Sequence, residues 1–194
     1  SAVFVIDLED GGKVLNSIAV TDVNDPNSNP VTNLVINSVP ADLVPITADS
    51  TSLIEFHGAL VYFADYEGKL WKLNLSDQGT LYDLQYLFDA EATVANERRV
   101  MFEVGASIDA TTNKLWLYYG TGNQQDLQSE TPTMQNKLYG IKDRNFPAYD
   151  ATAVSVTETS CVNISGLASC VVAGFDEGWY ANLDTNEKVT GAPA

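Results

Sequence analysis

The sequence has one histidine and two cysteines, few basic residues and no long apolar run. The single histidine, His57, and the absence of a Gly-x-Ser-x-Gly pattern argue against a serine hydrolase, whose nucleophile needs a histidine base and a tight turn. A membrane-spanning helix needs roughly 18 consecutive apolar residues, and the chain has no run of that length. We therefore expect no enzyme activity and no membrane span.

Acidic residues far outnumber basic residues in this chain of 194 residues. The 26 Asp and Glu residues against 10 Lys and Arg residues give a formal net charge of −16. A field of this sign repels phosphate groups, so we expect no binding to nucleic acids. The charge is typical of a secreted or salt-exposed protein, and a calcium-binding surface is the alternative. We interpret Asp65 and Glu67 as side chains of a solvated turn.

The two cysteines, Cys161 and Cys170, flank a stretch of mostly small and polar residues, 162–169, that could close as a hairpin loop. The even count predicts a disulfide between them, worth about 2 to 3 kcal/mol for a short loop. Such a bond would place the protein outside the cytoplasm. Two buried free thiols are the alternative. A zinc site is not expected, because the single histidine is distant in the sequence.

Alternating and β-branched stretches dominate the chain and predict strands. They lie at 3–8, 14–20, 34–39, 60–64, 69–75, 115–119, 137–141 and 153–156. Turn signals rich in Asp, Asn and Gly separate them. Helix signals are weak, and the best candidate is a short turn near 89–98. The pattern predicts an all-β fold.

A strand followed by a turn or loop with glycine recurs along the chain. The glycines at positions 11, 68, 122 and 178 are separated by 57, 54 and 56 residues. This period near 55 residues is a little longer than the roughly 40 to 50 residues of common propeller blades. It predicts a single domain, 1–194, that is a partial β-propeller of three to four blades. Because closed rings have roughly four to eight blades, we expect a fragment of a longer protein or a ring completed by another chain.

The three tryptophans, Trp71, Trp116 and Trp179, lie in or next to these repeats. One blade cannot bury both faces of its sheet, so successive blades must stack their apolar faces. We expect the tryptophans to pack between blades. Ligand platforms are the alternative role.

Four segments have a recognisable order of residues. The first reads Val-Tyr-Phe-Ala-Asp-Tyr-Glu-Gly-Lys-Leu-Trp and continues over 61–75; the others are Leu-Tyr-Tyr-Gly-Thr-Gly at 117–122, Lys-Leu-Tyr-Gly-Ile-Lys-Asp at 137–143 and Glu-Gly-Trp-Tyr-Ala-Asn-Leu at 177–183. In this order they resemble the carboxy-terminal β-propeller of the PilY family of type IV pilus-associated proteins. The residues before 61 match that family more loosely.

The resemblance implies an extracellular protein of the bacterial surface, associated with the type IV pilus, or fimbrium. Its role would be to support pilus assembly, to counter retraction and to contribute to adhesion. The implied partners are pilins or minor pilins and host or surface ligands. Two alternatives stay open: a fragment of a propeller dehydrogenase that uses pyrroloquinoline quinone, and a purely structural subunit of a filament. The chain has no vicinal cysteine pair and is short for the dehydrogenase.

The resemblance also implies a calcium loop just before the tyrosine strand, but this sequence has few oxygen ligands there. Segment 45–55 places Asp49 and Glu55 far apart, with aliphatic residues between them. A weak candidate is the turn-rich loop with Asp22, Asn24, Asp25 and Asn27, which lacks the glycine and the final bidentate Glu of an EF-hand loop. We expect no cofactor, and at most weak calcium binding there, with Kd of about 10⁻⁴ to 10⁻³ M.

Overall fold

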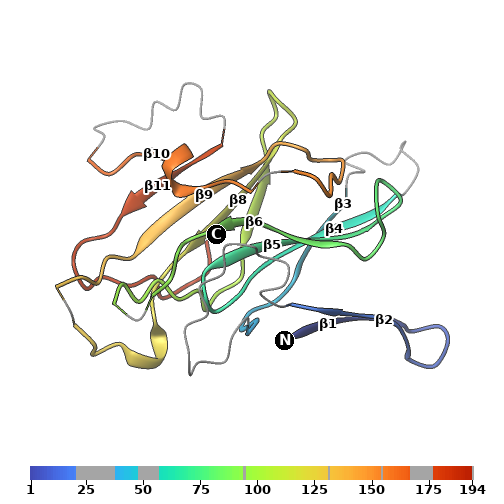
Figure 1. The fold of residues 1–194 in the computed structure, drawn as a ribbon, viewed down its shortest axis with the longest axis horizontal. Coiled ribbons are helices and arrows are strands. Elements are labelled where there is room, and N and C mark those ends of the chain that lie inside the picture. Colours follow the sequence, from blue (N-terminus) through green and yellow to red (C-terminus); the bar gives the residue numbers. More distant parts are fainter. Residues whose placement is uncertain are drawn as a thin grey trace.

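The computed structural model describes residues 1–20, 38–47, 57–93, 95–130, 132–153, 155–166 and 177–193. These residues form three β-sheets and two short 3₁₀ turns, Gln124–Asp126 and Glu158–Ser160, with no α-helix among them (Figure 1). The all-β prediction is confirmed. The expected strand at 34–39 lies outside the described residues up to position 37, and residues 38 and 39 are not in a strand. The expected turn-rich loop with Asp22, Asn24, Asp25 and Asn27 also lies outside the described residues.

The first sheet, called here the hairpin sheet, pairs β1 (Ala2–Asp7) with β2 (Lys13–Ala19) in antiparallel fashion. Its turn is closed by Asp7, whose Oδ1 accepts hydrogen bonds from the backbone N–H groups of Glu9 and Asp10. Asp is favoured in such turns because its side chain can bond the backbone two or three residues ahead.

The second sheet, the central sheet, has four antiparallel strands in chain order. These are β3 (Val44–Thr47), β4 (Gly58–Ala64), β5 (Lys69–Ser76) and β6 (Leu84–Asp89). Every residue of β4 from Leu60 to Ala64 is buried. Its continuous apolar run is the pattern expected of a strand that is covered on both faces.

The third sheet, the outer sheet, begins as a similar antiparallel meander. Its strands are β7 (Gly105–Ile108), β8 (Leu115–Gly120), β9 (Lys137–Asp143) and β11 (Gly178–Asn182), with the two-residue β10 (Val162–Asn163) parallel to β11 at the edge. A long connection that contains the Gln124–Asp126 turn separates β8 from β9.

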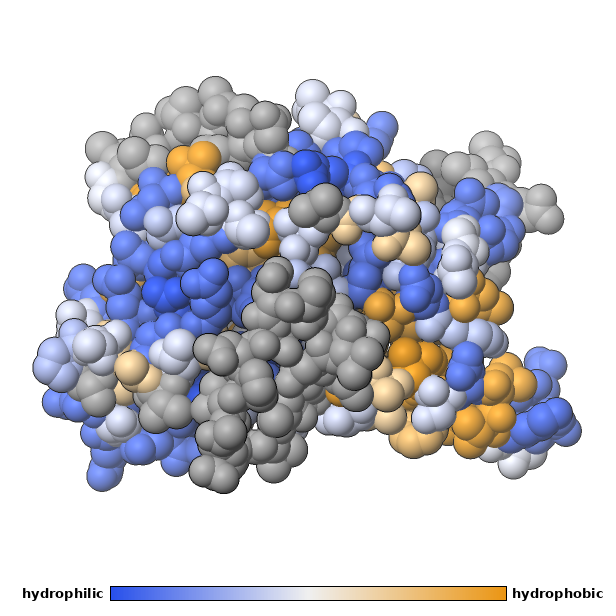
Figure 2. Space-filling model, in the orientation of Figure 1, coloured by the Kyte–Doolittle hydropathy of each residue, from blue (hydrophilic) through white to orange (hydrophobic). Residues whose placement is uncertain are grey.

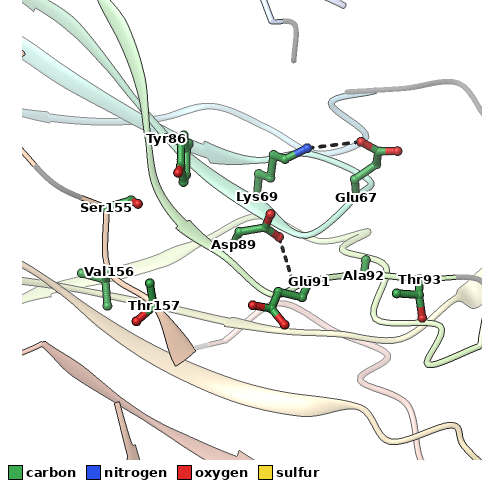
Figure 3. Close-up of a pocket in the computed structure, with 10 residues that line it drawn as sticks. All are labelled: Glu67, Lys69, Tyr86, Asp89, Glu91, Ala92, Thr93, Ser155, Val156 and Thr157. Carbon is green, nitrogen blue, oxygen red and sulfur yellow. Dashed lines mark hydrogen bonds and ion pairs between the residues drawn. The ribbon is translucent and has the colours of Figure 1, made fainter. Parts of the chain in front are cut away.

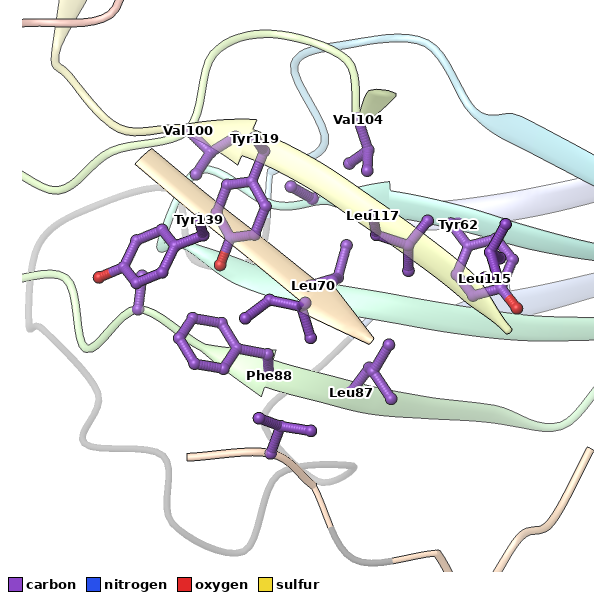
Figure 4. Packing of buried hydrophobic residues seen from close by; sticks show 14 of the residues in the cluster. Tyr62, Leu70, Leu87, Phe88, Val100, Val104, Leu115, Leu117, Tyr119 and Tyr139 are labelled. Atoms are coloured by element: carbon purple, nitrogen blue, oxygen red, sulfur yellow. The ribbon is translucent and has the colours of Figure 1, made fainter. Parts of the chain in front are cut away.

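The central sheet lies between the other two sheets and contributes to two hydrophobic cores. Because side chains alternate across a strand, Tyr62 of β4 faces one core and Phe63 faces the other. The first core joins the central sheet to the outer sheet, and its members from β4, β5, β6, β8 and β9 include Leu60, Tyr62, Leu70, Phe88, Leu117, Tyr119, Tyr139 and Ile141 (Figure 4). The second core joins it to the hairpin sheet through Val3, Ile18, Val61, Phe63, Trp71 and Leu73.

Several aromatic rings contact one another in the first core. Tyr119 and Tyr139 stack with their ring centroids 5.3 Å apart, and Phe88 of the central sheet lies 5.0 Å from Tyr139. Such pairs add about 0.5 to 1.5 kcal/mol each beyond the apolar area that they bury. These rings therefore join the two sheets at one end of their interface.

The sequence repeat has a structural counterpart in three strand pairs. The strands β1, β4 and β8 begin at Ala2, Gly58 and Leu115, so that each starts 56 or 57 residues after the one before, and each pairs with the next strand along the chain. Gly11 and Gly68 lie in the turns between the strands of the first two pairs, and Gly122 follows β8.

The fourth glycine of the repeat has a different position. Gly178 opens β11, at the side of β9 away from β8, and is not in a turn between paired strands. A Cβ atom there would lie 2.6 Å from the carbonyl oxygen of Gly140 on β9, so glycine is required for close strand contact. The period therefore describes three strand pairs, and Gly178 coincides with it for a separate reason.

Candidate functional site

A cavity of about 360 Å³ lies at the edge of the central sheet, where β5 begins and β6 ends. We call it the edge cavity (Figure 3). It is lined by Glu67, Lys69, Tyr86, Asp89, Glu91, Ala92, Thr93, Ser155, Val156 and Thr157. Segment 155–157 reaches this position because Val156 forms a parallel bridge with Phe88 of β6 and donates its N–H to Leu87 O at 2.7 Å.

The buried part of the edge cavity holds an ion pair. Lys69 Nζ lies 3.4 Å from Glu67 Oε2, and the two residues are only 4% and 7% exposed. The other carboxylate oxygen, Glu67 Oε1, is buried and has no hydrogen-bond partner among the described residues. Figure 3 shows that Glu67 directs one oxygen to Lys69 and the other away from it. The interpretation of Asp65 and Glu67 as solvated is wrong, since Asp65 is fully buried as well.

Asp65 shapes the turn that carries Glu67 and Lys69. Its Oδ1 accepts hydrogen bonds from the N–H groups of both residues at 3.0 Å, and its Oδ2 accepts one from Trp71 Nε1 at 2.9 Å. Burial raises the pKa of Asp65 to about 7, and the bonds from Trp71 and Lys69 oppose that rise only in part. A glycine is needed at Gly68, where φ is 88° and Ala90 and the Arg98 carbonyl approach closely.

The exposed mouth of the edge cavity is acidic. Asp89 Oδ1 accepts a hydrogen bond from the N–H of Glu91 at 2.7 Å, and the Glu91 carbonyl accepts one from Asn96 Nδ2 at 2.9 Å. Glu91 has φ of 53°, a left-handed conformation that is uncommon outside glycine, asparagine and aspartate. Tyr86 lies on one side, with its ring 6.2 Å from that of Trp71. The lining thus carries three carboxylates and one ammonium group.

A second cluster of charges, partly buried and centred on Glu158, lies next to the edge cavity. Lys137 Nζ donates to Glu158 Oε1, while Arg98 at 3.3 Å and the Tyr139 hydroxyl at 2.7 Å donate to Oε2. Burial alone would raise the pKa of Glu158, but the hydrogen bonds from Lys137 and Tyr139 outweigh it and lower that pKa. Both oxygens are therefore satisfied, and Glu158 is held as an anion.

A third buried carboxylate, Asp143 at the end of β9, joins the outer sheet to the central sheet. Its Oδ2 contacts Lys72 Nζ and accepts from the Tyr62 hydroxyl, each at 2.7 Å. Its Oδ1 accepts from the N–H groups of Asn145 and Phe146. Because both carboxylate oxygens have hydrogen-bond partners, Asp143 connects the two sheets and has no unsatisfied oxygen for a ligand.

The three tryptophans lie in three separate environments. Trp71 is fully buried in the core between the hairpin and central sheets. Trp116 of β8 is half-buried, with Lys142 Nζ 5.7 Å from its ring centroid. Trp179 of β11 lies over Gly140, its cross-strand partner on β9, where a Cβ atom would overlap the indole. The ring of Trp179 lies 6.2 Å from that of Tyr118. The structure does not bring these side chains together into one site.

The remaining predicted sites fall wholly or partly outside the described residues. Cys170 lies there, and so do Asp22, Asn24, Asp25 and Asn27. Cys161 is half-buried against the first core and has no disulfide partner among the described residues. Across the same residues, no three His, Cys, Asp or Glu side chains gather as metal ligands would. The disulfide between Cys161 and Cys170 and the weak calcium site stay predictions.

The edge cavity was not predicted from the sequence. The spacing of Asp65, Glu67 and Lys69 around Gly68 could have indicated it. A turn that leads directly into a buried strand with a tryptophan cannot expose all three charged side chains to solvent. Its other walls, 91–93 and 155–157, come from distant parts of the chain.

In the described ranges, no helix has the length and apolarity that crossing a membrane requires. No family model matches the chain, and no curated protein or solved structure matches it.

Proposed function

We propose that this chain is part of a β-propeller that acts as a non-enzymatic binding and assembly protein of the bacterial surface, associated with type IV pili. The observation that carries the propeller part is the face-to-face packing of successive antiparallel sheets that follow one another in the chain. This is how propeller blades bury their apolar faces.

The exposed apolar side chains of the hairpin sheet favour a further blade packed beside it. Its inner face packs on the central sheet, but several large apolar side chains on β1, β2 and the intervening turn are exposed: Phe4, Ile6, Leu8, Val14 and Leu15 (Figure 2). The strand at the corresponding place of the next repeat, β4, is buried on both faces. A neighbouring sheet packed on the hairpin would bury β1 in the same way, from elsewhere in a longer protein or from another chain.

The pilus association is supported by the PilY resemblance, whose motifs occupy defined places in the fold. Segment 61–75 covers the second half of β4 and all but the last residue of β5, while segments 117–122, 137–143 and 177–183 contain or overlap three neighbouring strands of the outer sheet. Within them, Gly140 provides the space that Trp179 fills. Gly140 and Trp179 therefore serve packing, and we assign no catalytic role to the motif residues.

The proposal is tested in two ways, with the purified chain and in the bacterium that encodes the protein. The purified chain is passed over immobilised major and minor pilins, and a strain that lacks the gene is scored for surface pili. We expect binding to a pilin, loss of surface pili on deletion, and their return when pilus retraction is also blocked. Normal piliation together with no pilin binding would overturn the pilus role. Binding of pyrroloquinoline quinone with oxidation of an alcohol would favour the dehydrogenase alternative.

A further inference from the structure

We infer that the hairpin sheet binds an extended segment of another protein, which adds to the free edge of β1 as an antiparallel strand. We call this surface the β1 edge; it is the side of β1 that faces away from β2. The added strand would continue the sheet in its own plane, and so differs from a blade packed on the face of the sheet. The inference rests on the three strand pairs and on the backbone of β1, and it does not depend on the pilus role.

Both strand pairs that follow the hairpin have a further strand at the equivalent edge. In the central sheet, β3 pairs in antiparallel fashion with Ala59–Tyr62 of β4, on the side away from β5. In the outer sheet, β7 pairs in the same way with Leu115–Tyr118 of β8, on the side away from β9. The hairpin sheet has only the equivalents of β4 and β5, and no described strand lies beside β1. The repeat therefore predicts a short antiparallel strand at the β1 edge.

The backbone of β1 presents hydrogen-bonding groups along this edge. In an antiparallel ladder, residue pairs that exchange hydrogen bonds alternate with pairs that do not. The Val20 N–H donates to the Ser1 carbonyl at 2.9 Å, so Ala2 and Phe4 belong to the pairs that do not exchange hydrogen bonds with β2. The N–H of Ser17, opposite Phe4, accordingly donates to a neighbouring side chain of its own strand. The N–H and C=O groups of Ala2 and Phe4 therefore point to the β1 edge.

The sequence of β1 lacks the features that protect a free edge. Edge strands in native proteins are protected by proline, by charged side chains or by a covering segment. Here β3 carries Pro45, and the edges of β6 and β11 are partly covered by segment 155–157 and by β10. Residues 2–6 include neither proline nor a charged residue, and Phe4 and Ile6 are 58% and 48% exposed. Such an edge is suited to pairing with the strand of a partner.

The hairpin sheet also indicates the chemistry of the partner segment. Apolar side chains of β1 lie beside the edge, so β-branched residues at alternate positions of the added strand would contact them. The turn after β1, within residues 7–13, carries three acidic residues and one basic residue. In antiparallel orientation the amino end of the partner segment lies beside this turn, and the net charge of −16 attracts a basic segment. The partner segment is therefore apolar at alternate positions and basic at its amino end.

The test is isothermal titration of the purified chain with the peptide acetyl-Lys-Lys-Thr-Val-Thr-Ile-Thr-Val-amide. We expect saturable binding at one site. Two further peptides carry methyl groups on the backbone nitrogens, either of the threonines or of the valines and isoleucine. An added strand directs only alternate N–H groups to its neighbour. One methylated peptide should therefore bind at least tenfold more weakly than the parent peptide, and the other should lose less than threefold.

Two variants of one residue locate the binding. Phe4→Pro removes the N–H that points to the β1 edge and leaves the hydrogen bonds to β2 in place, because proline is tolerated where the N–H faces away from the ladder. The matched control is Phe4→Ala, which removes the same side chain and keeps the N–H. We expect Phe4→Pro to weaken the peptide at least tenfold and Phe4→Ala to weaken it less than threefold. Circular dichroism checks that both variants fold.

Each other result would overturn the inference. No saturable binding, or equal losses in Phe4→Pro and Phe4→Ala, would show that the β1 edge does not accept a strand. A dimer of the purified chain in sedimentation that Phe4→Pro dissociates would assign the edge to a second copy. If the protein at the length that the bacterium produces does not bind the peptide while the chain of 194 residues does, a segment of the same protein fills the edge. Binding to pilins is measured separately, so that either proposal can fail alone.

Discussion

Lys72 of β5 and Asp143 of β9 form an ion pair across the interface of the central and outer sheets, with Nζ and Oδ2 2.7 Å apart and the two residues only 1% and 2% exposed. The Ala148 carbonyl accepts a second hydrogen bond from Lys72 at 3.1 Å. Taking two charges out of water costs more than the pair alone returns unless further hydrogen bonds satisfy both groups, as they do here.

Replacing Asp143 by asparagine should lower the free energy of unfolding by about 3 to 5 kcal/mol, because the Lys72 ammonium would stay buried without its counter-ion. Urea unfolding followed by tryptophan fluorescence measures the change. The control is the double variant Lys72→Met with Asp143→Leu, which removes both charges and should be more stable than Asp143→Asn. A single variant within about 1 kcal/mol of the original protein would contradict this account.

Gly140→Ala should destabilise the protein by about 1 to 3 kcal/mol, because the added methyl group overlaps the indole of Trp179 and forces it to move. The emission of the tryptophans should change at the same time. Gly191→Ala is the matched control, since nothing lies within 4 Å of a Cβ atom there. Equal effects of the two substitutions would show that the contact between Gly140 and Trp179 has no special importance.

The stability should depend on pH through Asp65. Burial raises its pKa from 3.8 to about 7 in the folded state, so between these values the folded protein binds a proton that the unfolded chain has released. The contribution of Asp65 to stability is therefore fully present below about pH 4 and falls as the pH rises towards 7, by an amount on the order of a few kcal/mol.

Asp65→Asn removes this titration. The free energy of unfolding of the original protein should therefore fall, relative to that of the variant, as the pH rises from 4 to 7. Urea unfolding at several pH values in this window measures it. A difference that stays constant over the window would mean that Asp65 titrates normally.

Thiol titration of the unfolded, unreduced protein should find no free cysteine if Cys161 and Cys170 are joined. If they are not, Cys161 should react slowly in the folded protein, because burial raises the pKa of its thiol to about 12. Two thiols that appear on unfolding would refute the disulfide and remove the support that it gives to an extracellular location.

The strands with long apolar runs could be predicted from the sequence, and the shorter edge strands could not. The stretches 3–8, 14–20, 60–64, 69–75, 115–119 and 137–141 correspond to β1, β2, β4, β5, β8 and β9. β3 was not predicted because Pro45 interrupts it, and proline is tolerated there because β3 lies at the edge of its sheet. Segment 153–156 yields only the bridge of Val156 to Phe88 among its described residues.

The short turn expected near 89–98 is present as a single turn, in which the Glu97 N–H donates to the Thr93 carbonyl at 3.1 Å, and it does not continue into a helix among the described residues. Thr93 and Asn96 stabilise this turn, because each side chain accepts a hydrogen bond from the backbone N–H of the other residue, at 2.8 Å and 3.1 Å. The burial of Glu67 was unpredictable for a different reason, since the residues that approach its neighbour Gly68 closely, Ala90 and Arg98, are distant in the sequence.

The bridge between Val156 and Phe88 also limits how this protein can self-associate. An open sheet edge is a template for strands of other molecules, and it is the usual starting point of aggregation. Segment 155–157 occupies part of the β6 edge, and β10 does the same beside β11. Growth of fibres by addition of strands is thereby obstructed at these two places.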